Sequence, residues 1–250
     1  MDETVVLLSA TLAPTKGFHT TSTTRFAIRS PRPRSCTLYL YFTLPAQLFV
    51  DPYELAHRRA YYTFERFGGG NLEAPVFAHG AGGPSGLLLD VIVPESVNDD
   101  EADEGDGRTL SVEVPLHARY GVPKAKMEGE LIDEVVFPPP EAFWACREQE
   151  RRAGGSQAKR AQVPDALRDA VKLAPAFRDG AEPMFVLVPR AKSVRAQTLR
   201  VPVGDAGDVA VVETGTVIAI LFAFVYLLRN IARASRGKRA DTVARAKKSI

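Results

Sequence analysis

The longest apolar run of the chain lies near its end, from Val209 to Leu228, and its only charged residue is Glu213. At about 1.5 Å per residue, a helix of this length spans the roughly 30 Å hydrocarbon core of a bilayer. A buried helix of a soluble domain is the alternative, but such a helix would not normally stay free of charge from Thr214 through Leu228. The pattern therefore predicts one transmembrane helix over 209–228.

Most of the preceding chain shows the alternation or the short apolar runs that are typical of β-strands. Residues 37–44 alternate most clearly, with leucine and phenylalanine on one face and only threonine and tyrosine on the other. Residues 86–94 have the composition of a buried strand, and residues 109–123 alternate again. Further extended runs are expected at 5–28, up to Phe137, at 185–188 and at 199–203.

The predicted fold is mostly β: six or so short strands form an antiparallel β-sandwich-like domain, followed by one C-terminal transmembrane α-helix. Elsewhere, helix is expected only in short pieces, at 52–58 and 165–173. The expected organisation is a lumenal β-rich domain over 1–205 with an acidic loop at 98–107 and a basic loop at 147–163, a transmembrane helix over 209–228, and a basic cytosolic tail over 229–250.

The orientation follows from charge, which is unevenly distributed although the formal net charge of the chain is only +2. Asp205 and Asp208 precede the predicted span, whereas the 22 residues from 229 to 250 contain many Lys and Arg and one acidic residue, Asp241. Because cytosolic flanks of membrane spans carry the excess of Lys and Arg, we expect the tail in the cytosol and the β-rich domain in a lumen. The tail would contact anionic membrane lipid, and the net acidic domain indicates no nucleic-acid partner.

The start of the chain does not fit a secretory signal peptide, because Asp2 and Glu3 occupy the place of its positively charged region. Since the predicted topology requires translocation, we expect either a missing upstream segment or an unconventional signal, and both alternatives stay open.

Cys36 and Cys146 are the two cysteines, and both fall on the predicted lumenal side, where disulfides form. A disulfide between them and two buried free thiols are both compatible with the sequence.

The sequence contains no motif with a clear catalytic logic. It lacks the patterns G-x-S-x-G, H-E-x-x-H and C-x-x-C, and also the Asp-x-Asp pair of many glycosyltransferases. Its histidines lack metal-ligand spacing, and the acidic loop 98–107 lacks the spacing of an EF-hand. We therefore expect no metal, no cofactor, no catalytic residue and no enzymatic activity; catalysis by residues that only the fold brings together is the alternative.

Four residues attract attention for recognition. The alternation over 109–123 places His117 and Arg119 opposite its apolar face. A solvent-facing or locally hydrogen-bonded pair is the expected role for them, and a recognition role is the alternative. Phe143 and Trp144 follow a run of three prolines and are expected to form an aromatic anchor.

Five separate blocks, in this order, resemble the PIG-X family: LPAQLFVDPYEL at 44–55, NLEAP at 71–75, VPLHARYGVP at 114–123, PPPEAFWAC at 138–146 and VPVG at 201–204. The resemblance extends from about Gly17 to Leu228, with gaps at the acidic and basic loops. Within these blocks, the candidate partner-contact or family-motif residues are His117, Arg119, Tyr120, Pro123, Phe143 and Trp144.

The resemblance implies a type I membrane protein of the endoplasmic reticulum that serves as the non-catalytic, stabilising subunit of GPI mannosyltransferase I. Its multispanning partner, of the PIG-M type, would carry the active site that adds the first mannose during GPI-anchor biosynthesis. A general lumenal folding factor or chaperone is the alternative, and an enzyme acting on the glycolipid directly is a third. The terminal Lys247 and Lys248 resemble a dilysine retrieval signal; a chance ending of a basic tail is the other interpretation.

Overall fold

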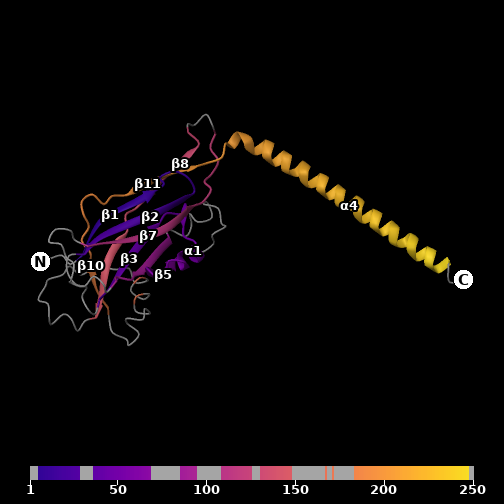
Figure 1. The fold of residues 1–250 in the computed structure, drawn as a ribbon. Helices are drawn as coiled ribbons and strands as arrows, with labels where there is room; N and C mark the ends of the chain where they lie inside the picture. Colours follow the sequence, from indigo (N-terminus) through magenta and orange to yellow (C-terminus); the bar gives the residue numbers. More distant parts are fainter. Residues whose placement is uncertain are drawn as a thin grey trace, which may run out of the picture. The chain divides into compact units, whose positions relative to one another are not determined.

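The computed structural model describes residues 5–28, 36–68, 85–94, 108–125, 130–147, 167, 171 and 183–247. The chain divides into two compact units, Met1–Val122 with Ile132–Val203, and Pro123–Leu131 with Gly204–Ile250. The first unit contains the β-sheets and the second contains the long C-terminal helix (Figure 1). The predicted acidic loop 98–107 lies outside the described residues, as does the basic loop 147–163 except for Arg147.

Three sheets build the first unit, and every pair of neighbouring strands in them is antiparallel. The four-stranded sheet has the order β1 (Val5–Ala13), β2 (His19–Ile28), β7 (Arg108–Ala118), β4 (Leu48–Phe49). The five-stranded sheet has the order β10 (Pro183–Leu187), β9 (Glu141–Arg147), β3 (Cys36–Leu44), β6 (Ser85–Val91), β5 (Tyr62–Phe67). The third sheet pairs β11 (Gln197–Pro202) with β8 (Ile132–Phe137), and the short helix α1 (Pro52–Ala56) follows β4.

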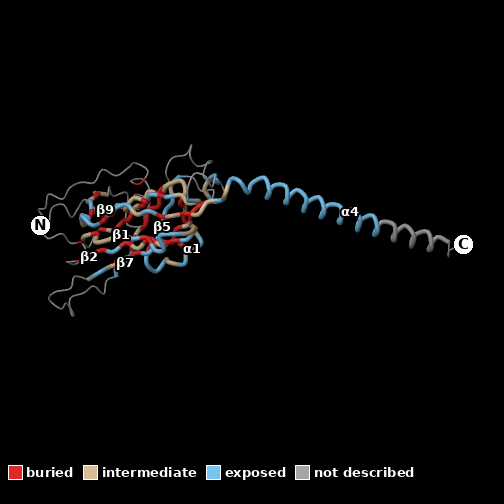
Figure 2. Tube along the Cα trace, turned by 90° about the horizontal axis from the view of Figure 1, so that it is seen from above, coloured by how far each residue is buried: buried red, intermediate tan, exposed pale blue. Residues whose placement is uncertain are grey.

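The main core is shared by the strands of all three sheets, as expected when each sheet turns one apolar face inward. On β3, the alternation predicts the buried face correctly, because Leu38, Leu40 and Phe42 are each at most 1% exposed. On β7, Val112 and Val114 occupy the equivalent inner positions. Figure 2 shows the buried residues concentrated in the strands. The predicted antiparallel, mostly β fold is therefore confirmed.

A second apolar cluster lies on the other face of the five-stranded sheet, the face to which the alternation along 37–44 assigned threonine and tyrosine. Tyr39 is only 2% exposed, and its ring is stacked on that of Phe143 with 5.6 Å between centroids. Leu167 and Val171 belong to the same cluster, and both lie in helical backbone within the predicted helix 165–173. Because side chains cover both faces of this sheet, alternation along β3 does not separate buried from exposed residues.

Strand β2 brings hydroxyl groups into the main core. Thr20, Ser22 and Thr24 share an inner face with Val112, which lies opposite Thr24 in the strand pairing, and all three are at most 4% exposed. The Thr20 hydroxyl donates a hydrogen bond to the carbonyl of Pro14 at 2.7 Å. The Thr24 hydroxyl has no hydrogen-bond partner among the described residues, which leaves a buried polar group uncompensated.

Replacing this hydroxyl is expected to stabilise the protein. Thr24→Val keeps the β-branched shape and removes the unpaired group, so the free energy of unfolding should rise by about 1–2 kcal/mol. Thr20→Val is the matched control and should not stabilise, because it removes a hydrogen bond that is made. Denaturant unfolding of the full chain in detergent measures both, and an unchanged or lower stability of Thr24→Val would contradict the expectation.

The second unit contains helix α4 (Val209–Lys247), which follows a 3₁₀ turn at Ala206–Asp208. The stretch Ala206–Ala234 is long and apolar enough to cross a membrane, and no part of its apolar window is buried within the protein. The predicted span is therefore present as a single candidate membrane helix among the described residues. The helix continues beyond residue 228, the predicted end of the membrane span, because the tail is rich in Ala, Arg and Lys, which are strong helix formers.

Candidate functional site

Two of the sequence blocks, 44–55 and 114–123, come together at the end of strand β7. The two residues of β4 pair with His117 and Ala118, and the backbone N–H of Arg119 donates to the carbonyl of Gln47 at 2.7 Å. The described part of β7 has only this two-residue strand on its outer side, whereas β2 pairs with its whole length. Side chains around α1 therefore have access to this side of β7.

Helix α1 is fixed by a local capping signal. Asp51 is its N-cap, and its carboxylate accepts a hydrogen bond from the backbone N–H of Tyr53 at 2.8 Å. Pro52 occupies the first turn, where its missing N–H is not needed. This start directs Glu54 toward β7, where its carboxylate lies 2.7 Å from Nε2 of His117. The predicted helical piece 52–58 thus has a structural role: it supplies an acidic partner from 63 residues away.

Aromatic rings and a buried cation surround this pair. The His117 ring meets the ring of His19 edge-on at 4.8 Å and stacks on Phe49 at 5.3 Å. The guanidinium carbon of Arg119 lies 4.7 Å from the centre of the Phe49 ring, a cation–π contact. We call His19, Phe49, Glu54, His117 and Arg119 the β7-end cluster.

The β7-end cluster corrects the prediction of a solvent-facing or locally bonded pair. Arg119 is 7% exposed, and burial lowers the pKa of its guanidinium, which nevertheless remains charged at neutral pH. His117 is half-buried, and the partners of both residues come from distant segments. The alternation could not reveal this, because a two-residue strand such as β4 has no detectable periodicity.

The residues after β7 leave the sheet and expose part of the block. Tyr120 is 79% exposed, although the alternation placed it on the apolar face, because the strand ends at Ala118. Its ring lies 4.8 Å from that of Phe18, and Val122 and Pro123 are also exposed. Of the candidate contact residues, Tyr120 and Pro123 are therefore the ones available at the surface.

Gly121 explains how this exposed turn is held. A Cβ atom at this position would overlap the carboxylate of Asp133 and lie 2.9 Å from Cγ1 of Val203, so only glycine fits without movement of its neighbours. The blocks 114–123 and 201–204 are therefore in close contact at this point. In the second unit, the backbone N–H of Lys124 also donates to the carbonyl of Gly204 at 3.0 Å.

Phe143 and Trp144, the expected aromatic anchor, lie inside the domain. They belong to β9, and alternation sends Trp144 into the main core and Phe143 into the second cluster, with exposures of 7% and 3%. This strand was not predicted, because residues 142–146 are all buried and show no alternation. In this structure the two rings stabilise the fold from within, and they present no contact surface.

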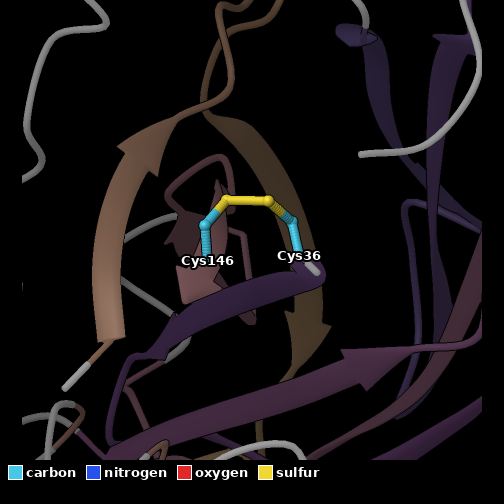
Figure 3. Close-up of a disulfide and its surroundings, with 2 residues drawn as sticks. All are labelled: Cys36 and Cys146. Atoms are coloured by element: carbon cyan, nitrogen blue, oxygen red, sulfur yellow. A yellow bond between two sulfur atoms is a disulfide. The ribbon is translucent and has the colours of Figure 1, made fainter. Parts of the chain in front are cut away.

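Cys36 and Cys146 form a disulfide (Figure 3). The two residues lie directly opposite each other on β3 and β9, and their sulfur atoms are 2.00 Å apart. Of the two alternatives that the sequence left open, the structure contains the paired one. The bond joins the central strand of the five-stranded sheet to its neighbour at a buried position.

A hollow of about 190 Å³ is lined by Arg58, Tyr61, Tyr62, Ser111 and Glu113. Arg58 donates to the Glu113 carboxylate at 2.9 Å, and the Tyr62 hydroxyl donates to the Glu113 carbonyl at 3.1 Å. The hollow is smaller than typical small-molecule sites, which measure about 300–1,000 Å³. Its contacts instead connect the segment after α1 to β7.

Tyr62 gives a testable dependence on pH. Burial raises its pKa to about 12 from 10.0, with Glu54 and Glu113 adding to the shift and Arg58 opposing it. The buried neutral phenol therefore contributes stability that is fully present below pH 10 and is lost as the pH rises through about 12.

In Tyr62→Phe, the free energy of unfolding should depend less on pH above 10 than it does in the wild type. Part of the dependence should remain, because burial also raises the pKa of Tyr39. Unfolding free energies measured between about pH 8 and pH 11.5 test this. The Phe variant should also lose about 1 kcal/mol at neutral pH with the hydrogen bond to Glu113. Parallel pH profiles for the two proteins would contradict the expectation.

The histidines and the terminal lysines are the remaining positions singled out in the sequence. Among the described residues, no group of three His, Cys, Asp or Glu side chains could hold a metal ion. His57 is exposed just after α1, whereas His79 lies outside the described residues. Of the two lysines of the expected retrieval signal, Lys247 ends α4 and Lys248 lies outside the described residues.

Comparison with known proteins gives one consistent result. A family model described as PIG-X / PBN1 matches residues 15–232. The chain is 28% identical over 229 residues to "Protein pbn1" of Neurospora crassa, which covers 87% of this chain and 41% of the relative. It is 30% identical over 205 residues to "Protein PBN1" of Gibberella zeae, covering 77% of this chain and 36% of that protein. The chain thus spans about two fifths of the length of these curated relatives.

Proposed function

The chain belongs to the PIG-X / PBN1 family, and on that premise we propose that it is a non-catalytic accessory subunit of GPI mannosyltransferase I in the endoplasmic reticulum. In this role it supports a multispanning catalytic subunit of the PIG-M type, which adds the first mannose during GPI-anchor biosynthesis. The observation that carries the proposal is the stretch Ala206–Ala234, which is long and apolar enough to cross a membrane and whose apolar window is not buried. Such a helix is free to associate with the helices of a membrane partner.

The proposed orientation places residues 1–205 in the lumen, 209–228 in the membrane and 229–250 in the cytosol. It is supported by the excess of Lys and Arg after the span and by the disulfide, which forms in oxidising compartments. Protease treatment of intact microsomes tests it. The β-rich domain should be protected and the tail digested; digestion of the domain from the cytosolic side would exclude a lumenal role.

Stabilisation of the partner would arise by mass action. A subunit that binds only the folded form of a membrane protein lowers the fraction that is unfolded and open to degradation. Depletion of this chain should therefore reduce the abundance of the catalytic subunit before it changes the turnover of each remaining molecule. Quantitative immunoblotting and mannose-transfer assays in the same membranes separate the two effects, and normal partner abundance after depletion would contradict the proposal.

The contact on the lumenal side is proposed to include Tyr120, which is 79% exposed at the end of the β7 block. Tyr120→Ala should reduce recovery of the catalytic subunit in co-purification about fivefold, which corresponds to ~1 kcal/mol. Tyr61→Ala is the matched control, because Tyr61 is also exposed, at 61%, but lies outside the five sequence blocks. Recovery of many unrelated clients by the wild-type chain would instead favour the general folding factor.

A further inference from the structure

One acidic residue of α4 lies where the bilayer is expected. The charge-free run 214–228 covers only about 22 Å as a helix, which is shorter than the roughly 30 Å hydrocarbon core. If the membrane-spanning stretch is extended toward the C-terminus, it includes Arg229 and Arg233. If it is extended toward the N-terminus, it includes Glu213 and the four uncharged apolar residues before it, 209–212. The extension with fewer charges therefore places Glu213 within the hydrocarbon region.

Nothing in the described chain compensates this carboxylate. None of the hydrogen bonds or ion pairs among the described residues involves the side chain of Glu213. The nearby hydroxyls of Thr214 and Thr216 already donate to the carbonyls of Ala210 and Val212, at 2.7 and 2.8 Å. The helical neighbours one turn away are uncharged: Val209, Ala210, Thr216 and Val217.

An ionisable side chain within a membrane span is costly, and it usually pairs with another group inside a bundle of helices. We propose that Glu213 binds a Lys or Arg side chain on a transmembrane helix of the partner, which packs on the face of α4 formed by Val209, Glu213, Val217 and Ile220. These residues lie three or four apart and therefore share one face, and the apolar members are all exposed. The inference rests on the proposed function only for the identity of the partner. The basic character of the partner's side chain follows from charge complementarity with Glu213.

The first experiment changes the charge in the full-length chain and measures the partner recovered from membranes in mild detergent. Glu213→Lys should reduce recovery at least about tenfold, because it places two cations together. Glu213→Leu should also reduce it, although it makes the span more apolar and easier to insert. Asp208→Asn is the matched control, since it removes one negative charge just before α4 and should leave recovery unchanged.

The second experiment locates the face. Both cysteines of the chain are in the disulfide, so an introduced cysteine is the only free thiol. Val217→Cys should crosslink to a membrane protein through a short thiol-reactive reagent, whereas Ile218→Cys, which points about 100° away, should not. Replacing the basic residue of the crosslinked partner helix with Glu should then restore the recovery lost in Glu213→Lys.

The outcomes separate this inference from the proposed function. The inference would be overturned if Glu213→Leu and Glu213→Lys both recovered as much partner as the wild type does. In that case the Glu213 carboxylate only reaches the lipid headgroups and makes no contact with the partner. Crosslinking to a second copy of this chain would also overturn it. If charge-dependent crosslinking identifies a membrane protein other than the mannosyltransferase, the charge pair stands and the proposed function fails.

Discussion

Replacing both cysteines, as Cys36→Ala with Cys146→Ala, is expected to lower the free energy of unfolding by about 4–5 kcal/mol. The expectation comes from the length of the loop that the disulfide closes, with 110 residues separating its ends. In the chain-entropy model, a loop of this length restricts the unfolded chain strongly, and the native state loses little when both sulfurs are replaced by small apolar groups. Since ordinary domains are stable by about 5–15 kcal/mol, a loss of this size removes a large share of the stability.

Denaturant unfolding of the full chain in detergent measures the effect, with the wild type in reducing agent as the second arm. The reduced wild type and the double variant should unfold at similar, lower denaturant concentrations. Non-reducing electrophoresis shows whether the bond is present, because the closed chain migrates faster. An oxidised wild type that unfolds at the same denaturant concentration as the double variant would contradict the expectation.

Phe42→Ala is expected to lower the free energy of unfolding by about 3–5 kcal/mol. Phe42 is fully buried in the main core, and its ring stacks on Phe137 with 6.1 Å between centroids. This contact joins β3 of the five-stranded sheet to β8 of the two-stranded sheet. The substitution therefore removes apolar burial and also the packing that holds β8 against the core.

Phe42→Leu is the matched control, because it keeps an apolar side chain of similar volume and should cost less than about 1.5 kcal/mol. Amide hydrogen exchange adds a local measurement. In Phe42→Ala, the amides of β8 and β11 should lose protection more than those of β1 and β2, which are paired in another sheet. Uniform loss across all strands would show that β8 does not depend on this contact.

Strand β7 was predicted well from the sequence because buried and exposed residues alternate along much of its length. Along β7, for example, Val112, Val114 and Leu116 are buried while Ser111 and Glu113 are exposed, so period two is visible in the sequence. The candidate membrane helix was also predictable, because an apolar run of about 20 residues with few charges is typical of a membrane span. Six or so strands were expected from the sequence, whereas the described residues form eleven.

Prediction from the sequence failed where side chains are buried for reasons of tertiary structure. In β9, Phe143 and Trp144 are buried on opposite faces, so no polar position marks the strand. The β7-end cluster was equally hidden, because the contact of His117 with Glu54 and that of Arg119 with Phe49 depend on a two-residue strand and a five-residue helix. The short helix at 52–58 was predicted from Pro52, but nothing in the sequence predicted which strand it would meet.

Helix α4 is longer than a membrane crossing requires. Its 39 residues extend about 58 Å, and the part from residue 229 to Lys247 accounts for about 28 Å of this length. A headgroup layer takes up only about 5–8 Å on each side of the hydrocarbon core. If this part stays straight along the bilayer normal, it acts as a stiff spacer with a reach of roughly 20 Å into the water. A protein that binds its far end would then be kept clear of the lipid surface.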